Sequence, residues 1–196
     1  MKNKKMLVGI ITLALMLMLS ACGSSSNQNS SNKNTNTDQK STKMDKNMDM
    51  SGMKMSGSAE VPKGLKVAQN PTFKVGSQAV VHADHMEGMN GATATIVGAF
   101  DTIAYSVTYT PTTSGAPVKN HKWVIQEEIK NAGTAQLKLG TKVTLEGDHM
   151  EGMKGAEATI DSLVHTTVYM INYTPTTGGA KVTNHKWVTE SELSAK

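Results

Sequence analysis

The stretch Asp-His-Met-Glu-Gly-Met occupies residues 84–89 and recurs without change at residues 148–153. A recurrence of this kind indicates an internal duplication, and a duplication constrains the architecture before any strand is assigned. The stretch also places one imidazole and two thioethers next to a glycine that permits a sharp turn. Soft and borderline metals favour such donors, copper(I) above all. The repeated stretch therefore bears on both fold and function.

The duplication extends well beyond this stretch. Residues 74–129 align with residues 138–193 without a gap, and about half of the positions are identical. Besides the turn, the densest matches are Tyr-x-x-x-Tyr-Thr-Pro-Thr-Thr, at 105–113 and 169–177, and Asn-His-Lys-Trp-Val, at 120–124 and 184–188. The folded part of the chain is therefore predicted to be two copies of one unit.

Each copy has the pattern of a small β unit. Apolar and polar residues alternate at period two through 103–109 and 167–173, which is typical of strands. The Pro-Thr-Thr segments that follow supply turns. Four or five short strands in ~60 residues suggest a small barrel of the SH3 type. The predicted fold class is all-β, with two tandem small SH3-like β-barrel repeats that pack on each other. Trp123 and Trp187 are expected to be core or interface anchors.

The N-terminus is predicted to be a lipoprotein signal. Three early lysines precede an apolar run at 6–19 that is too short to span a membrane. The run ends in Leu-Ser-Ala-Cys at 19–22, which resembles a bacterial lipobox, so Cys22 is expected to be lipidated. The alternative is an incidental Cys22 behind an ordinary signal peptide. Because Cys22 is the only cysteine, the chain has no intrachain disulfide.

These features predict four segments. They are a signal peptide at 1–21, a lipidated flexible tether at 22–59, and repeat domains at 60–133 and 134–196. The tether is polar, with almost no hydrophobic side chains except methionine, so it cannot bury enough apolar surface to fold. The net charge of +4 is modest, and no basic run is interleaved with aromatic residues. Nucleic-acid binding is therefore not expected. The expected location is the outer face of the bacterial cytoplasmic membrane.

The turns supply the main candidate metal ligands. Copper(I) accepts two or three soft donors, whereas zinc gains little from thioethers. The alternative is that the methionines fill a small core and the histidine caps the turn. The candidates are His85, Met86, Met89, His149, Met150 and Met153.

Other histidines extend the candidate set. His82 is three residues before His85, and the second repeat has Glu146 at that position, so the first site is expected to be the richer one. His121 and His185 recur beside the tryptophans. They are either structural residues or further ligands that the fold brings to the turn.

The tether carries a second group of candidates. A polar segment without a core gains nothing from apolar thioethers, so the methionines there are predicted to capture metal. They are Met44, Met48, Met50, Met53 and Met55.

An enzymatic function finds little support in the sequence. It contains no Gly-x-Ser-x-Gly, no phosphate-binding loop and no His-Glu-x-x-His.

Each repeat also ends in a short acidic turn, at 127–128 and at 190–192.

At the repeated motifs the chain resembles the YdhK-like family of bacterial lipoproteins, which includes the copper-binding lipoprotein CopL. The resemblance covers residues 75–193. It implies copper binding at the cell surface, with the turn residues as ligands, and a functional link to a copper-exporting ATPase.

The leading hypothesis is a non-enzymatic, membrane-anchored copper(I)-binding protein that stores or relays copper, with copper(II) as the second oxidation state considered. The rival hypothesis is an SH3-like adhesion module that binds cell wall or a partner protein. In that case the methionine turns would be merely structural.

Overall fold

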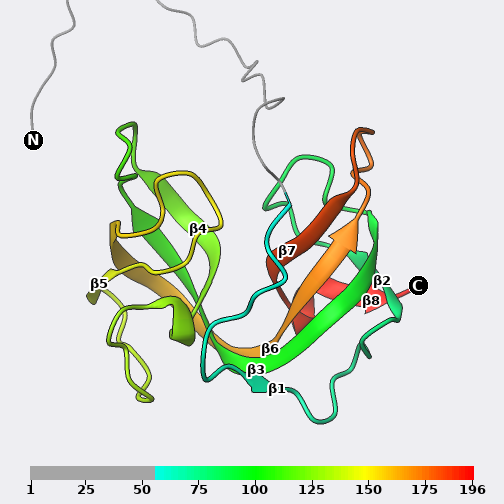
Figure 1. The fold of residues 1–196 in the computed structure, drawn as a ribbon, viewed down its shortest axis with the longest axis horizontal. Coiled ribbons are helices and arrows are strands. Elements are labelled where there is room, and N and C mark those ends of the chain that lie inside the picture. Colours follow the sequence, from blue (N-terminus) through cyan, green and yellow to red (C-terminus); the bar gives the residue numbers. More distant parts are fainter. Residues whose placement is uncertain (1–55) are drawn as a thin grey trace, which may run out of the picture. The chain divides into compact units, whose positions relative to one another are not determined.

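Two long strands, β3 (Thr93–Tyr109) and β6 (Glu157–Tyr173), organise the described part of the chain (Figure 1). The computed structural model describes residues 56–196. The predicted signal peptide, Cys22 and the five tether methionines lie outside these residues. Within residues 56–196, no helix is long and apolar enough to cross a membrane.

The other elements are short. They are β1 (Lys66–Val67), β2 (Gln78–Val81), β4 (Val118–Ile125), the 3-10 turn η2 (Gln126–Glu128), β5 (Lys142–Thr144), β7 (Val182–Thr189), the 3-10 turn η3 (Glu190–Glu192) and β8 (Leu193–Ala195).

Strands β3 and β6 pair antiparallel along nearly their whole length. The register runs from Ala94 opposite Tyr173 to Tyr109 opposite Ala158. The sequence pattern indicates alternation within these stretches at 103–109 and 167–173. The structure has one longer strand in each stretch, because the partner strand pairs with it along nearly its whole length. Register shifts lie between Ile96 and Gly98 and between Ser106 and Val107.

The all-β fold with two tandem repeats is confirmed. The pairing path runs β5-β6-β3-β2-β8, with β1 and β4 added on β3 and β7 added on β6. This path does not return to its start, so the sheet is open rather than closed into two separate rings.

Each hydrophobic core is built from halves of both repeats. In the first cluster, Val81, Met89 and Ile96 of the first repeat pack with Tyr169 and Ile171 of the second. We call the part of the molecule around this cluster lobe A.

The second cluster has the converse composition. Here Tyr105 and Val124 of the first repeat pack with Leu145, Met153 and Ile160 of the second. This part is lobe B. Each lobe therefore combines the N-terminal half of one repeat with the C-terminal half of the other.

A third cluster contains both tryptophans. Trp187 is fully buried and Trp123 is 9% exposed, and both pack with Phe100, Ile125 and Met170. The expectation that the tryptophans are core anchors is confirmed. Because the cluster draws on β3, β4, β6 and β7, it joins residues of the two lobes.

The turns of the two repeats are also joined by hydrogen bonds. The Thr176 N–H donates to the Gly88 carbonyl over 2.8 Å, and the Thr112 N–H donates to the Gly152 carbonyl over 2.9 Å. Gly88 has φ +72, and a Cβ there would lie 2.6 Å from Thr177 Oγ1 and 2.8 Å from Pro175 Cβ. The repeated Gly and Pro-Thr-Thr motifs are therefore explained by close approach across the repeats.

Replacing Gly88 with alanine tests how much this close approach contributes to stability beyond the cost of a positive φ alone. Gly140 has a similar φ of +77 with nothing within 4 Å of its would-be Cβ, so Gly140→Ala is the matched control. We expect Gly140→Ala to cost about 1–2 kcal/mol of unfolding free energy from its positive φ. Gly88→Ala should cost about 1–3 kcal/mol more, as overpacking does. Denaturant titration of both variants measures the difference. Equal losses of unfolding free energy would contradict a close approach of the two turns at Gly88.

The exchange of halves predicts how a single repeat behaves. A chain limited to residues 134–196 lacks the half-core that residues of the first repeat supply to each lobe. We expect it to be unfolded or to form a dimer in which two copies exchange halves. Analytical ultracentrifugation with circular dichroism tests this, and a folded monomer would contradict it.

Candidate metal centre

Two turn histidines are held at the ends of short strands. His85 follows β2 and His149 follows β5, and their side chains are only 6% and 10% exposed. Within the turns, the Met89 N–H donates to the Met86 carbonyl and the Met153 N–H donates to the Met150 carbonyl. The two turns therefore have the same local hydrogen bond and the same buried histidine.

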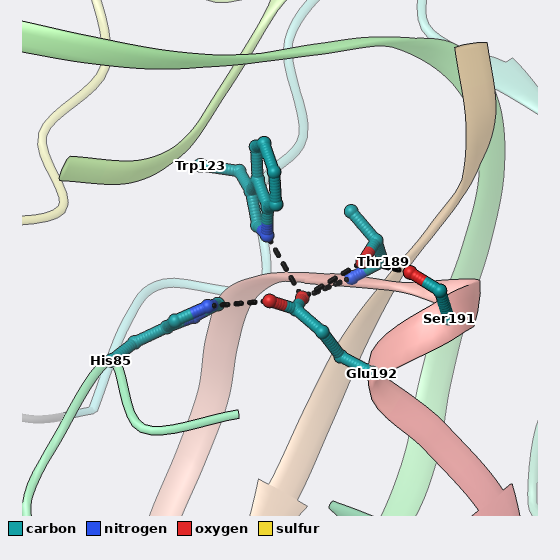
Figure 2. A network of polar contacts seen from close by, with 5 residues as sticks. All are labelled: His85, Trp123, Thr189, Ser191 and Glu192. Atoms are coloured by element: carbon teal, nitrogen blue, oxygen red, sulfur yellow. Dashed lines mark hydrogen bonds and ion pairs between the residues drawn. The ribbon is translucent and has the colours of Figure 1, made fainter. Parts of the chain in front are cut away.

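Each turn histidine pairs with a glutamate of the other repeat. His85 Nε2 lies 2.9 Å from Glu192 Oε1 (Figure 2). The other carboxylate oxygen of Glu192 accepts from the Trp123 indole over 2.8 Å and from the N–H and hydroxyl of Thr189 over 2.9 and 2.8 Å. A single carboxylate thus joins the turn and the tryptophan of the first repeat.

The second copy repeats this arrangement. His149 Nε2 lies 2.7 Å from Glu128 Oε1. Glu128 Oε2 accepts from the Trp187 indole over 3.0 Å and from the Ile125 N–H over 3.2 Å. Since Glu128 belongs to the first repeat and His149 and Trp187 to the second, the two repeats exchange these contacts reciprocally.

Both carboxylates are held ionised. Burial opposes ionisation of Glu192, but its hydrogen bond from His85 and the charge of that ring, with the Thr189 and Trp123 donors, bring its pKa to about 2. The pKa of Glu128 is also lowered, because His149 and the neighbouring donors outweigh its burial. An ionised carboxylate can only accept, so the proton of each pair belongs to the histidine Nε2.

His121 and His185 lie on the facing strands β4 and β7. Asn120 and Asn184, directly before them, have φ +49 and +52, and the pairing with β3 and β6 shifts register at these points. Asparagine tolerates this left-handed conformation better than most residues do, which accounts for its place in the motif.

Both strand histidines are neutral at physiological pH. Burial is the largest cause and, with the other histidines, it lowers the pKa of His121 to about 4 and that of His185 to about 3. Their rings pack edge-on against Tyr109 and Tyr173, with centroids 5.8 and 5.9 Å apart. Each ring therefore offers a lone pair on an uncharged imidazole, the form that binds metals.

Four buried histidines each have a ring nitrogen without a hydrogen-bond partner. Only five buried side-chain N or O atoms within residues 56–196 lack a hydrogen-bond partner, and four of them are on these rings. They are His85 Nδ1, His149 Nδ1, His121 Nε2 and His185 Nε2. The fifth is the hydroxyl of Tyr173, the tyrosine that packs against His185. We call these four side chains the imidazole cluster.

The structure places the other predicted ligands differently. Met89 and Met153 are fully buried in the cores of lobe A and lobe B, and Met86 and Met150 pack against those cores. The positions of these four methionines agree with the alternative that they fill a core. His82 is exposed and bonded to Ser194, so it is not part of the cluster.

The sequence analysis did not single out the two glutamates as site residues. It placed Glu128 and Glu192 only in short acidic turns. One signal was present, because the two occupy equivalent positions in the repeats and are conserved between the copies, while their acidic neighbour Glu127 corresponds to Ser191.

The arrangement suits a borderline metal ion. Imidazole nitrogen binds copper, zinc and nickel, and a ligating histidine typically donates its other N–H to a carboxylate. Within residues 56–196, no three or more His, Cys, Asp and Glu side chains are placed so that they could hold a metal ion together.

Replacing Glu128 with glutamine should destabilise the fold. Glutamine keeps only one acceptor oxygen, so its NH₂ must face either the N–H donors of Trp187 and Ile125 or the Nε2–H of His149. We expect Glu128→Gln to lower the unfolding free energy by about 2–4 kcal/mol. The neighbouring Glu127 accepts one hydroxyl, from Thr102, so Glu127→Gln should cost less than about 1 kcal/mol. Chemical denaturation compares the two, and a loss of equal size would argue against the buried network.

Comparison with known proteins places the chain in a family. The model of the family described as "Protein of unknown function (DUF1541)" matches residues 75–126 and 139–190. The chain is 62% identical over 144 residues to the "Uncharacterized protein YdhK" of Bacillus subtilis strain 168, a match that covers 74% of this chain and 70% of the relative.

Solved structures of that protein show the same fold. The crystal structure of the DUF1541 family protein ydhK from Bacillus subtilis, at 2.00 Å resolution, has a TM-score of 0.71 and 62% identity, covering 73% of this chain and 97% of that one. The solution NMR structure of the ydhK C-terminal domain has a TM-score of 0.60 and 63% identity, covering 63% and 93%. These matches establish fold and family. The chain belongs to the DUF1541 family, with one copy of the family domain in each repeat.

Proposed function

We propose that this protein is a non-enzymatic copper-binding lipoprotein on the outer face of the bacterial cytoplasmic membrane. It stores or relays copper and so contributes to copper tolerance. Cys22 carries the lipid anchor, and the tether methionines at positions 44, 48, 50, 53 and 55 add capture of copper(I). A copper-exporting ATPase is the functional partner that the family resemblance suggests.

The observation that carries the proposal is the imidazole cluster. An unpaired buried polar group costs about 1–3 kcal/mol, so four nitrogens without partners need a reason to be retained. A bound metal ion supplies one, because it would satisfy lone pairs that no protein donor reaches. The reciprocal glutamates support the same conclusion, since they orient two of the rings as carboxylates orient ligating histidines.

Copper fits this donor set better than other divalent first-row metals. Affinity of a given site rises along the first row to copper(II) and falls again at zinc. The donors are neutral nitrogens, with no thiolate available, because Cys22 is the only cysteine. The methionine-rich tether supports copper(I) capture, since thioethers select this ion.

Removing the imidazole cluster should weaken copper binding. We expect His85, His121, His149 and His185, changed together to glutamine, to lower the affinity of the mature chain for copper by about 100-fold or more. Both chains should carry serine at the five tether methionines, so that capture by the tether does not mask the effect. Titration with copper(I) and with copper(II), each against a competing chelator, measures the affinities.

The matched control changes two histidines outside the cluster. His82 is bonded to Ser194 and His165 to Gln136, and both are exposed. His82→Gln with His165→Gln should leave copper affinity unchanged. Equal affinities of the four-histidine variant and the parent would refute the proposed function.

A further inference from the structure

We propose that the edge of strand β4 in lobe B is a docking site for an extended Ser-Gly segment, and that residues 50–52 of a second copy of this chain occupy it. The site uses backbone and side-chain hydrogen bonds and needs no metal, so it stands independently of the proposed function. It would join neighbouring copies of the protein through their tethers.

The site is recognised from its counterpart on β7 in lobe A. There the first described residues of the chain lie along the edge of β7 that does not face β6 (Figure 1). The Gly57 N–H donates to the Thr183 carbonyl over 2.9 Å, and the Thr183 N–H donates to Ser56 Oγ over 3.0 Å. Asn184 Nδ2 donates to the Gly57 carbonyl over 3.3 Å. We call residues 56–60 the strap.

The strap is held in one direction and requires a glycine. The Lys186 ammonium group donates to the Glu60 carbonyl, so the strap runs in the same direction as β7. A Cβ on Gly57 would lie 2.7 Å from the Asn184 carbonyl oxygen, which is a backbone atom and cannot swing aside as a side chain would. The edge of β7 therefore takes an extended segment with serine followed by glycine, a form of strand addition.

The groups of β7 that hold the strap recur on β4 at the equivalent positions of the first repeat. The three counterparts are Lys119, Asn120 and Lys122. The two asparagines have the same left-handed backbone, with φ +49 at Asn120 and +52 at Asn184. The N–H of each points inward, to the Thr108 side chain on β3 and to the Asn172 side chain on β6. The two edges therefore present the same backbone and amide groups outward.

The edge of β4 is uncovered in the part of the chain that the structure describes. The pairing of β4 with β3 passes from Val118 to His121 and leaves out the two residues between them. These residues, Lys119 and Asn120, are exposed, whereas their counterparts under the strap are only partly exposed. An open strand edge is a template for a further strand.

The sequence of the strap identifies the occupant. The strap continues the sequence Met-Ser-Gly at 55–57, and this triplet occurs once more in the chain, at 50–52. Its glycine meets the steric condition found on β7, and its serine supplies the hydroxyl acceptor. Residues 50–52 themselves lie outside the described residues.

Charge also favours this pairing of segment and edge. Asp49 directly precedes the triplet at 50–52, whereas Lys54 directly precedes the triplet at 55–57. The edge of β4 has Lys119 where the edge of β7 has the uncharged Thr183. The acidic segment is therefore matched to the basic edge.

A second copy supplies the segment, because the two edges lie at opposite ends of the β3–β6 pair. The edge of β4 is bonded to Thr108 of β3, and the edge of β7 is bonded to Asn172, whose partner on β3 is Thr95. Thr95 and Thr108 are 13 positions apart (108 − 95), which is about 40 Å along the strand. The two Met-Ser-Gly triplets are 5 positions apart (55 − 50), which spans at most about 18 Å. A chain whose strap lies on β7 therefore does not bring residues 50–52 to its own β4.

Cross-linking between two kinds of copy tests the docking. All mature chains carry Cys22→Ser, so that each introduced cysteine is the only one in its chain. One kind carries Ser51→Cys and the other carries Lys119→Cys. We expect a short bis-maleimide to join them in a mixture. Lys66→Cys is the matched control for Lys119→Cys, because Lys66 is exposed but pairs with Asp101 in the middle of β3, and it should give no cross-link above background.

The requirement for glycine gives a second test. Gly52→Val should weaken the association of mature chains about 10-fold or more, because its side chain would meet the backbone of β4 as a Cβ on Gly57 would meet that of β7. Gly23→Val, elsewhere in the predicted tether, should leave the association unchanged. On the other partner, Asn120→Gly keeps the left-handed backbone and removes the amide donor, so it should weaken association as well. Sedimentation velocity over a range of protein concentrations measures these effects, and near-ultraviolet circular dichroism verifies that each variant is folded.

The outcomes separate the parts of the proposal. Monomers at every concentration, without cross-links, would overturn it entirely. A cross-link that forms only within single chains carrying both cysteines, independently of concentration, would overturn the second copy as the occupant. Association that neither Gly52→Val nor Asn120→Gly weakens would overturn the edge of β4 as the site. Because all these measurements are made without copper, they leave the proposed copper binding to its own test.

Discussion

The antiparallel pairing of β3 with β6 is the constraint on which the rest of the structure depends. Because each strand runs the length of both lobes, the chain cannot fold one repeat and then the other as closed units. The halves of each repeat are instead completed by the other repeat, in the core as well as in the turns. Every contact at the candidate metal centre that crosses between repeats follows from this exchange.

Because the repeats exchange halves, each buried glutamate is hydrogen-bonded to a histidine of the other repeat. A buried carboxylate is costly unless its oxygens are well hydrogen-bonded, and Glu192 meets this condition with donors from His85, Trp123 and Thr189. The same bonds hold the histidine through Nε2 and leave its Nδ1 without a protein partner. The network that stabilises the fold thus also leaves one ring nitrogen of each turn histidine buried and unbonded.

The sequence predicted the composition of this fold better than its connectivity. The repeat and its period identify two copies, and alternation identifies strands near 103–109 and 167–173. Alternation is local, however, and both copies have the same pattern, so it cannot show which copy supplies the partner for a given half-strand. The long pairing of β3 with β6 depends on that choice.

The site was predictable in part for a similar reason. The turn and strand histidines were identified from the sequence, because repeated histidines are uncommon and chemically distinctive. Met89 and Met153 are equally repeated, but a thioether serves as a ligand or as core depending on burial, and burial is set by the other repeat. Glu128 and Glu192 were placed only in acidic turns, since their partners are 21 and 107 positions away along the chain.

Because of the duplication, each contact of the candidate centre occurs twice, once in each direction between the repeats. The sequence alone did not indicate this equivalence. His82 has no histidine counterpart in the second repeat, which suggested unequal sites, yet its ring is exposed and bonded to Ser194. The buried turn histidines are present in both copies, and each contact with a glutamate has its reciprocal in the other copy, as in a symmetric dimer. Each of these pairs takes its histidine from one repeat and its glutamate from the other. The network as observed therefore depends on both copies being present, which gives a structural reason for the duplication.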